Sequence, residues 1–354
     1  MKDKYLNQLK KIYLSLPSFL REPASNILYR QNIKKAFKVF LTEKERNDSK
    51  LLKNLRKDIL KCRQQYSTKA DEYFLFGFRN LAPAQRDKFL PDWVKDTVMQ
   101  KVVGLDVYTQ EIRNKYNFYK LLGQYFKRNV MFLPSRGGKY EDFERFALEN
   151  THLFMKRNSS SRGRGIRCCE VQSKEDARKV WETLAKDGDD WIIEEKIIQV
   201  PETAQWNQSS VNTVRLPAIF NDEKFTVLGP FLRTGRAGAI ADNAGAGGIF
   251  ACIDPKTGVI TTDGIDENGI YYETHPDSGF RYKGWQVPKW KELLEYAEQI
   301  HKEVPHHKYV GWDFALSEKG WMLVEGNWGQ FVSQYNDHIG LKKQFFELLG
   351  LTIS

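Results

Sequence analysis

Two carboxylates and one amide near the C-terminus have the residue types and the spacing of a divalent-cation site. Side chains alternate between the two faces of a strand, and a turn over residues 317–320 would place Asp313 almost opposite Glu325, with Asn327 on the same face as Glu325. Two carboxylates at this separation repel each other unless a cation lies between them. Their oxygens suit Mg²⁺ that is shared with phosphate oxygens. The alternative is a polar strand face on which each acid pairs with Lys or Arg.

A lysine followed by a loop of small residues could hold phosphates. Lys156 would stand at the end of a strand, and residues 158–165 form the loop, which contains Ser161, Gly163 and Gly165. The backbone N–H groups of such a loop can close over phosphate oxygens. The residue order of a Walker loop is absent. The alternative interpretation is a flexible basic connection between two strands.

Further candidates lie on apolar strands. Residues 192–198 form an apolar strand that ends in charged residues, and an adenine needs an apolar slot beside exposed backbone donors and acceptors. Arg215, Arg233 and Arg236 lie on or at the ends of strands that are otherwise apolar. Such arginines commonly extend only their charged ends into solvent. Close to acidic metal ligands, however, they could stabilise charge during phosphoryl transfer.

The periodicity of the chain predicts the elements that must position these residues. The first ~110 residues are expected to be helical, because residues 32–40 and 51–62 have apolar positions three and four apart, which is typical of amphipathic helices. After Thr151 the pattern changes, and a capping box at residues 173–176 begins a helix. Strands are expected at residues 151–155, 166–171, 191–198, 211–220, 224–233, 309–316 and 321–327, and helices at residues 290–302 and 341–349.

The positive charge of the chain is concentrated near its N-terminus. Residues 1–70 hold 18 Lys and Arg against 6 Asp and Glu, a balance of +12, which leaves −2 for the rest because the whole chain carries +10. This segment could contact an anionic membrane face, an anionic polymer or a phosphorylated substrate. The alternative is a set of solvated basic helix faces. Because no nucleic-acid-binding motif accompanies the charge, we expect no nucleic-acid partner.

The composition excludes other classes of protein. A hydrophobic content of 41% with 28% charged residues is ordinary for a packed soluble protein. No apolar run approaches the ~20 residues that cross a bilayer. The four cysteines show no metal-binding spacing and fit a reducing compartment. We therefore expect a cytoplasmic protein, with peripheral contact to the inner membrane face through residues 1–70 as one option.

The order of these features resembles the ATP-grasp superfamily: a lysine at position 115 or 120, Lys156 before its loop, an acid-ended strand and the acidic hairpin. Within this superfamily the sequence is similar to the sugar-transfer-associated ATP-grasp family, and the similarity covers residues 70–350. The segments that carry it are Ser210–Arg215, Arg233–Gly238, Asp242–Ile249, His275–Gly279, Gly311–Phe314 and Val324–Asn327.

The resemblance implies an α+β fold in which two subdomains hold ATP between antiparallel sheets, preceded by a mainly helical region. The implied domains are residues 1–112, helical and basic; residues 113–200, a small subdomain with the glycine-rich loop; and residues 201–354, a C-terminal subdomain with the metal site. Lys115 and Lys156 would hold phosphates, with Lys120 as the alternative to Lys115. Glu194, Glu195 and Ile197 would line the adenine site, and Asp313, Glu325 and Asn327 would bind one or two Mg²⁺.

The activity that the resemblance implies is an ATP-dependent carboxylate–amine ligase acting through an acyl phosphate. Its partners would be small carboxylate and amine substrates, with a sugar acid or an amino acid among them, in surface polysaccharide assembly. One alternative is a kinase that uses the same nucleotide site and transfers phosphate to a hydroxyl. The other is a non-catalytic protein that binds anionic polymers or membrane surfaces through residues 1–70.

Overall fold

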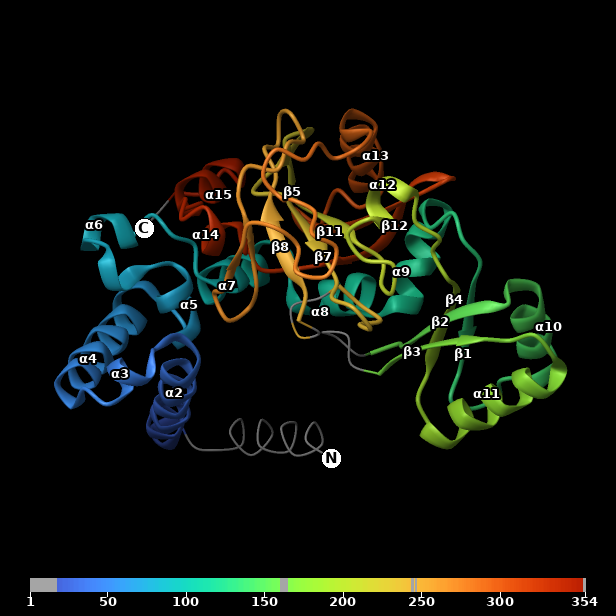
Figure 1. Cartoon of the computed structure of the whole chain (residues 1–354), viewed down its shortest axis with the longest axis horizontal. Helices are drawn as coiled ribbons and strands as arrows, with labels where there is room; N and C mark the ends of the chain where they lie inside the picture. The colour runs from blue at the N-terminus through green and yellow to red at the C-terminus, as the bar shows by residue number, and fades with distance from the viewer. Residues whose placement is uncertain (1–17, 160–164, 243–244, 246, 353–354) are drawn as a thin grey trace. The chain divides into compact units, whose positions relative to one another are not determined.

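The computed structural model describes residues 18–159, 165–242, 245 and 247–352 of the chain (Figure 1). These residues divide into two compact units, within Met1–Asp87 and Lys88–Ser354. The expected domains at residues 1–112, 113–200 and 201–354 stay a prediction. Among the residues described, no helix combines the length and the apolar character needed to cross a bilayer.

The first unit is helical where it is described, as its periodicity predicts. Asp48 caps its α4 helix by accepting a 2.9 Å hydrogen bond from the backbone N–H of Leu51. One face of α4 is buried through Leu55, Ile59, Cys62 and Tyr66. The elements are α2 (Ser18–Phe40), α3 (Glu43–Arg46), α4 (Ser49–Tyr66), α5 (Ala70–Leu75), η1 (Phe78–Asn80) and α6 (Pro83–Arg86).

A four-stranded antiparallel sheet with two helices forms one part of the second unit. Its strand order is β1-β4-β2-β3, and helix α11 begins at the predicted cap Ser173, whose side chain accepts from the N–H of Asp176, and ends at Gly188. Apolar side chains of the two helices pack against those of the strands in one cluster. The elements are β1 (Val130–Leu133), α10 (Tyr140–Asn150), β2 (His152–Arg157), β3 (Ile166–Glu170), α11 (Lys174–Asp187) and β4 (Trp191–Glu195).

An eight-stranded antiparallel sheet forms the other part. Its order is β10-β9-β8-β7-β5-β11-β12, and β6 pairs with β5. Asn221 pairs with Lys224, so a tight turn joins the strands expected at residues 211–220 and 224–233, and the second of these is divided into β6 and β7. The strands are β5 (Thr213–Asn221), β6 (Lys224–Val227), β7 (Phe231–Thr234), β8 (Ile249–Cys252), β9 (Gly264–Ile265), β10 (Tyr271–Tyr272), β11 (Tyr309–Ser317) and β12 (Gly320–Asn327).

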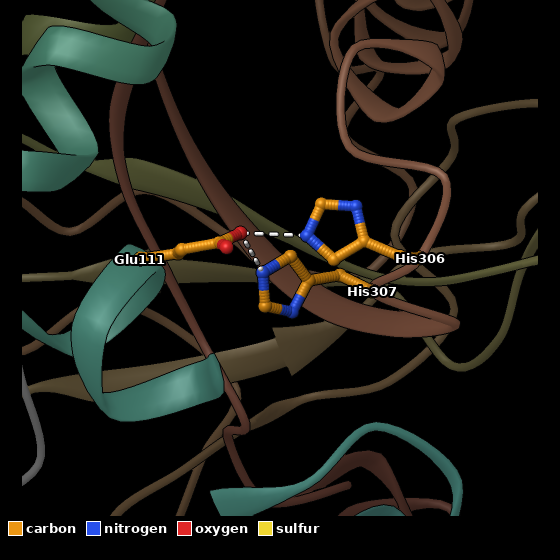
Figure 2. Close-up of side chains that lie close together, drawn as sticks. All are labelled: Glu111, His306 and His307. Carbon is orange, nitrogen blue, oxygen red and sulfur yellow. Dashed lines mark hydrogen bonds and ion pairs between the residues drawn. The ribbon is translucent and has the colours of Figure 1, made fainter. Parts of the chain in front are cut away.

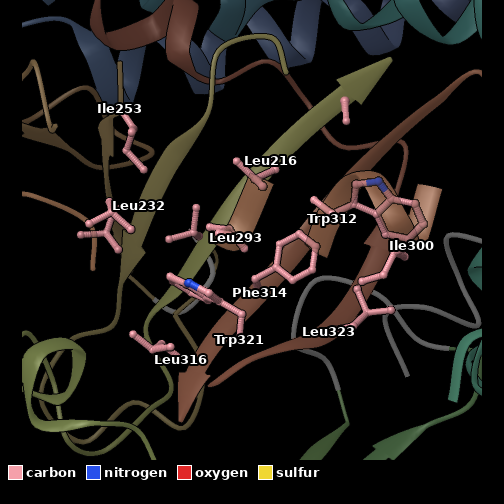
Figure 3. Packing of buried hydrophobic residues seen from close by; sticks show 14 of the residues in the cluster. Leu216, Leu232, Ile253, Leu293, Ile300, Trp312, Phe314, Leu316, Trp321 and Leu323 are labelled. Atoms are coloured by element: carbon pink, nitrogen blue, oxygen red, sulfur yellow. The ribbon is translucent and has the colours of Figure 1, made fainter. Parts of the chain in front are cut away.

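Helix α13 (Trp290–Lys302) has the predicted bounds and packs on this sheet. Figure 3 shows Leu293 and Ile300 of the helix beside Trp312 and Phe314 of β11, within the largest buried apolar cluster. The remaining elements of the second unit are α7 (Asp92–Val102), α8 (Leu105–Tyr108), η2 (Thr109–Arg113), α9 (Lys115–Leu122), η3 (Gly123–Tyr125), α12 (Pro201–Ala204), α14 (Ser333–Asn336) and α15 (Lys342–Leu348).

His301 of α13 is fully buried and held in one neutral tautomer. The indole N–H of Trp312 donates to Nδ1 of His301 at 3.2 Å, so the ring proton must be on Nε2, which lies 2.7 Å from the backbone oxygen of His307. A second proton on Nδ1 would oppose the indole N–H. Burial therefore lowers the pKa of His301 to about 4.

This lowered pKa predicts a pH dependence of stability. The unfolded chain takes up a proton at this histidine near pH 6.5 whereas the folded chain does not, so the stabilisation is complete above pH 6.5 and is lost as the pH falls toward 4. The free energy of unfolding falls by about 3 kcal/mol between pH 6.5 and pH 4 because of this histidine. We expect urea unfolding of His301→Gln to show a weaker pH dependence than wild type between these values. Parallel pH profiles for the two proteins would contradict the assignment.

Candidate active site

The β11–β12 hairpin brings the three predicted metal-binding side chains together. Asp313 pairs with Glu325, and Gly311 pairs with Asn327, across the two strands. The register shifts by one residue just after Asp313, as in a β-bulge. This shift changes the near-opposite placement expected from the turn into a direct pairing. The predicted proximity of Asp313 and Glu325 is confirmed.

Asp313 is fully buried and is bound by two arginines from neighbouring strands. Arg215 of β5 donates from Nε to one carboxylate oxygen and from Nη2 to the other at 2.7 Å. Arg233 of β7 lies 2.8 Å from Oδ2 through its Nη2. Burial alone would raise the pKa of Asp313, but the two guanidinium groups hold it below its ordinary value. Both oxygens of this predicted metal ligand are therefore engaged by arginine.

Glu325 differs from Asp313 because its carboxylate is partly exposed and, within the described part of the chain, makes no ion pair or hydrogen bond. Its charge acts on Lys115 and Arg215. Asn327 accepts a 3.0 Å hydrogen bond from Nη1 of Arg215. This set of carboxylate and amide oxygens fits a hard cation such as Mg²⁺. Glu325 is the ligand most open to it, while Asp313 would become available only if an arginine moved.

Two glycines leave the space that the Arg215 side chain occupies. A Cβ at Gly311 would lie 3.3 Å from Cδ of Arg215. A Cβ at Gly329 would overlap Nη1 of Arg215 and lie 2.5 Å from Oδ1 of Asn327. The guanidinium can therefore bridge Asp313 and Asn327 only because both positions lack a side chain.

This packing predicts the effect of Gly329→Ala. The added methyl group should displace the Arg215 guanidinium and reduce the free energy of unfolding by about 1–3 kcal/mol, as overpacking of a core does. Urea unfolding measures the loss. Gly123→Ala is the matched control, because the three atoms nearest its Cβ belong to the ring of Tyr119, at 3.0 to 3.3 Å, and none of them belongs to an ion pair. Equal stability of Gly329→Ala and wild type would contradict the packing argument.

Lys156 takes part in a second charged cluster, in the four-stranded sheet. Its Nζ lies 2.9 Å from Oε1 of Glu194. Arg128 binds the other oxygen of Glu194 with Nε at 3.0 Å and Nη2 at 2.8 Å, and Nη1 of Arg128 donates to the backbone oxygen of Leu323 on β12 at 2.7 Å. Burial would raise the pKa of Glu194, but Arg128 and Lys156 hold it below its ordinary value. Arg128 therefore connects the Lys156 cluster to the strand that carries Glu325.

Residues of both clusters act electrostatically on Lys115. Burial lowers its pKa, Glu325 and Glu194 oppose that effect, and Lys156 adds to it. Asn114 caps the α9 helix, and the backbone N–H of Tyr116 donates to Oδ1 of Asn158 at 2.9 Å, which fixes this helix end beside the loop after Lys156. Lys120 is exposed and lies over the Tyr116 ring at 4.8 Å. The assignment of a phosphate contact to Lys115 rather than Lys120 stays a prediction.

The other predicted nucleotide-binding residues lie near the same sheet. The carboxylate of Glu195 accepts from the backbone N–H of Asn129 at 3.1 Å, and partly buried Ile197 follows β4. Gly165 has φ +72°, in the left-handed region that favours glycine. Ser161 and Gly163 lie outside the described residues. Because Glu194 and Glu195 both have engaged carboxylates, we expect any contact with adenine here to come from the backbone.

Arg236 does not join the other two predicted arginines. Its Nε lies 2.8 Å from Oδ2 of Asp277, in a partly exposed pair. Arg233 instead donates to the hydroxyl of Thr213 at 2.9 Å and lies 3.6 Å from Asp242. Burial raises the pKa of Asp242, although the nearby charge of Arg233 lowers it in part. Arg128 and Asp242 are site residues that sequence reasoning did not select, although Asp242 begins one of the segments that carry the family resemblance.

The family assignment follows from a match to a family model. Residues 111–344 match the model described as sugar-transfer associated ATP-grasp. This match spans more than half of the chain and every described residue of both charged clusters. The chain belongs to the sugar-transfer associated ATP-grasp family. The predicted ATP-grasp fold, with antiparallel sheets, helices and a helical N-terminal region, is thereby confirmed.

Solved structures show a more distant likeness to this ATP-grasp chain. The D-alanine-D-alanine ligase from Coxiella burnetii shares 12% identity at a TM-score of 0.36, over 61% of this chain and 48% of the ligase, about half its length. The D-alanine-D-alanine ligase from Bacillus anthracis shares 13% sequence identity with this chain at a TM-score of 0.40, and the match covers 72% of this chain and 70% of the ligase. The ATP-grasp ligase PsnB, complexed with minimal precursor, Mg and ADP, shares 13% sequence identity at a TM-score of 0.38. This match covers 84% of this chain and 70% of PsnB. No curated protein matches the sequence.

Proposed function

We propose that this ATP-grasp protein binds Mg-ATP and joins a carboxylate to an amine. The observation that carries the proposal is that Arg128 connects two charged clusters, both of which act electrostatically on Lys115. One contains Lys156, Glu194 and Arg128, and the other surrounds the Asp313–Glu325 pair with arginine. Ammonium groups suit phosphate oxygens, and the acidic pair suits the cation that accompanies them. Family membership supports the same interpretation.

In the proposed reaction a carboxylate oxygen attacks the γ-phosphorus of ATP, and the bond from that phosphorus to the ADP oxygen breaks. The resulting acyl phosphate is attacked at its carbonyl carbon by an amine. The bond to phosphate then breaks, phosphate leaves, and the nitrogen loses a proton to give the amide. Lys115 and Lys156 would hold phosphates, and Arg215 and Arg233 would stabilise charge on the transferred group.

The arginines that engage Asp313 imply a rearrangement when nucleotide binds. Phosphate oxygens would offer Arg233 a new anionic partner, and its departure would free Oδ2 of Asp313. Asp313, Glu325 and Asn327 could then hold Mg²⁺, which would shield the phosphate charge. Arg215 would stay on β5, where it pairs directly with Asp313 across the sheet.

Product analysis tests the proposal. The purified protein is incubated with ATP, MgCl₂, a panel of sugar acids and amino acids, and a panel of amines, and the products are identified by mass spectrometry. We expect ADP and phosphate to appear together with an amide, and only when both substrates are present. A phosphorylated hydroxyl compound without an amine requirement would instead establish the kinase alternative. The setting that we propose is surface polysaccharide assembly in the cytoplasm.

We also propose that the basic first unit contacts anionic surfaces. Lys53, Lys57 and Lys61 recur every four residues on α4, so they share one helix face, and all three are exposed. Each lysine near an anionic bilayer contributes ~1 kcal/mol to binding. Three together would strengthen association by roughly a hundredfold.

Replacement of these three lysines by glutamine is expected to weaken co-sedimentation with phosphatidylserine-containing vesicles by roughly that factor. The matched control replaces three exposed lysines of the second unit, Lys291, Lys302 and Lys343. Because only charge is removed, ATP binding should not change in either variant. Equal weakening in both variants would show that net charge, rather than the α4 face, governs the association.

A further inference from the structure

A glutamate and two histidines form a separate cluster that the proposed reaction does not use. Oε2 of Glu111 lies 2.6 Å from Nε2 of His306 and 3.0 Å from Nε2 of His307. Figure 2 shows the two imidazole rings directing these nitrogens toward the same carboxylate oxygen. One ligand atom from each of the three residues lies within 4.8 Å of the others. Three donors therefore converge on one point.

The fold fixes two sides of this cluster independently. Glu111 lies in η2, a short π-helix just before the cap of α9. The histidines lie in the turn between α13 and β11, where the backbone N–H of His307 donates to the oxygen of Val304 at 2.9 Å. The buried ring of His301 holds the backbone oxygen of His307, as described above. The position of the His307 ring is thus set by its backbone before any ligand binds.

The polar contacts of His307 point into the cluster. Its side chain is 0% exposed, and among the described residues its Nδ1 has no hydrogen-bond partner. Because the ionised carboxylate of Glu111 only accepts, Nε2 of His307 carries the ring proton in this hydrogen bond, and a cation at the centre of the cluster would take the Nε2 lone pair as that proton is displaced.

The remaining two side chains give access from solvent. The side chains of His306 and Glu111 are 50% and 38% exposed. Ligand atoms of a tetrahedral Zn²⁺ site lie about 3.3 Å apart when each is ~2.0–2.1 Å from the ion. The present separations of 2.6 and 3.0 Å need to widen by about 0.7 and 0.3 Å to reach that spacing, and the larger movement falls on His306, whose side chain is half exposed.

We propose that Glu111, His306 and His307 bind a Zn²⁺ ion with one position open to solvent. A donor set of two imidazole nitrogens and one carboxylate oxygen binds Zn²⁺ in preference to Mg²⁺, which is harder and favours oxygen ligands alone. The ion would join the segment just before Lys115 to the turn just before β11, which carries Asp313. It would therefore restrain two elements that carry candidate active-site residues.

The test measures zinc binding directly and needs no nucleotide. After treatment with a chelator and its removal, the full chain is titrated with ZnCl₂ in a calorimeter, and Co²⁺ absorption reports the coordination. We expect one ion per chain in wild type, and at least tenfold weaker binding in Glu111→Gln and in His306→Ala, because each loses a ligand. Zinc should also raise the melting temperature of wild type but not that of His306→Ala.

The matched control is His152→Ala, which removes another half-exposed histidine that lies beside a glutamate, Glu170, at 3.7 Å. Its zinc affinity should equal that of wild type. His306 is half exposed, so His306→Ala can be judged even if Glu111→Gln fails to fold. Absence of a stoichiometric ion in wild type, or equal affinity in wild type and His306→Ala, would overturn the proposal and leave a hydrogen-bonded cluster without metal.

Discussion

Glu325→Gln is expected to lower ATP turnover by at least about a hundredfold while leaving the protein folded, because in the proposed site this carboxylate would hold a cation and does not support the core. A loss of this size is typical for the removal of one group that stabilises transition-state charge. Within the described residues the Glu325 carboxylate has no ion-pair partner, so its neutralisation leaves no buried charge uncompensated. ADP release and thermal melting measure the two effects.

Asp313→Asn tests a second carboxylate that would both bind the cation and support the fold. Its turnover should fall as much as that of Glu325→Gln, but its stability should also fall, by about 3–5 kcal/mol, because Arg215 and Arg233 would lose their shared buried anion. Urea unfolding of the two variants side by side gives the comparison. Near-wild-type turnover in Glu325→Gln would refute the metal assignment, and equal stability of the two variants would refute the structural role of Asp313.

Structural features whose determinants lie close together in the chain could be predicted from the sequence. The proximity of Asp313 and Glu325 follows from a tight turn between two strands, since hairpin register is fixed by turn length, whereas their direct pairing also needs the register shift after Asp313. The start of α11 follows from the capping chemistry of Ser173. In each case the signal and the structure lie within a few residues of each other, so chain periodicity and turn geometry determine the outcome.

Contacts between distant segments could not be predicted in this way. Arg128 binds Glu194 from 66 residues away, and Glu111 meets His306 from 195 residues away. The engagement of both Asp313 oxygens depends on the side-by-side order of β7, β5 and β11, which no local pattern specifies. The sequence therefore identified Asp313 as a candidate metal ligand, whereas the structure shows that a metal would compete with arginine for it.

Lys156→Ala is expected to weaken the binding of ATP by tenfold to a hundredfold. Lys156 lies near Lys115, whose own pKa it affects, and the loss of one charge-assisted contact to a phosphate corresponds to about 1.5–3 kcal/mol. Glu194 would keep both of its hydrogen bonds from Arg128 in this variant. Because the buried carboxylate stays compensated, the fold should persist and the affinity change should report on phosphate recognition.

Comparison of ATP with adenosine decides whether Lys156 recognises phosphate. Adenosine has no phosphate, so its affinity should be nearly the same in wild type and Lys156→Ala, while that of ATP falls. Lys120→Ala is the matched control, because Lys120 lies exposed over the Tyr116 ring and its removal should affect neither ligand. Isothermal titration of all three proteins with both ligands gives the answer. An equal loss for ATP and adenosine in Lys156→Ala would mean that the Lys156–Glu194 pair supports the sheet and that the phosphates bind elsewhere.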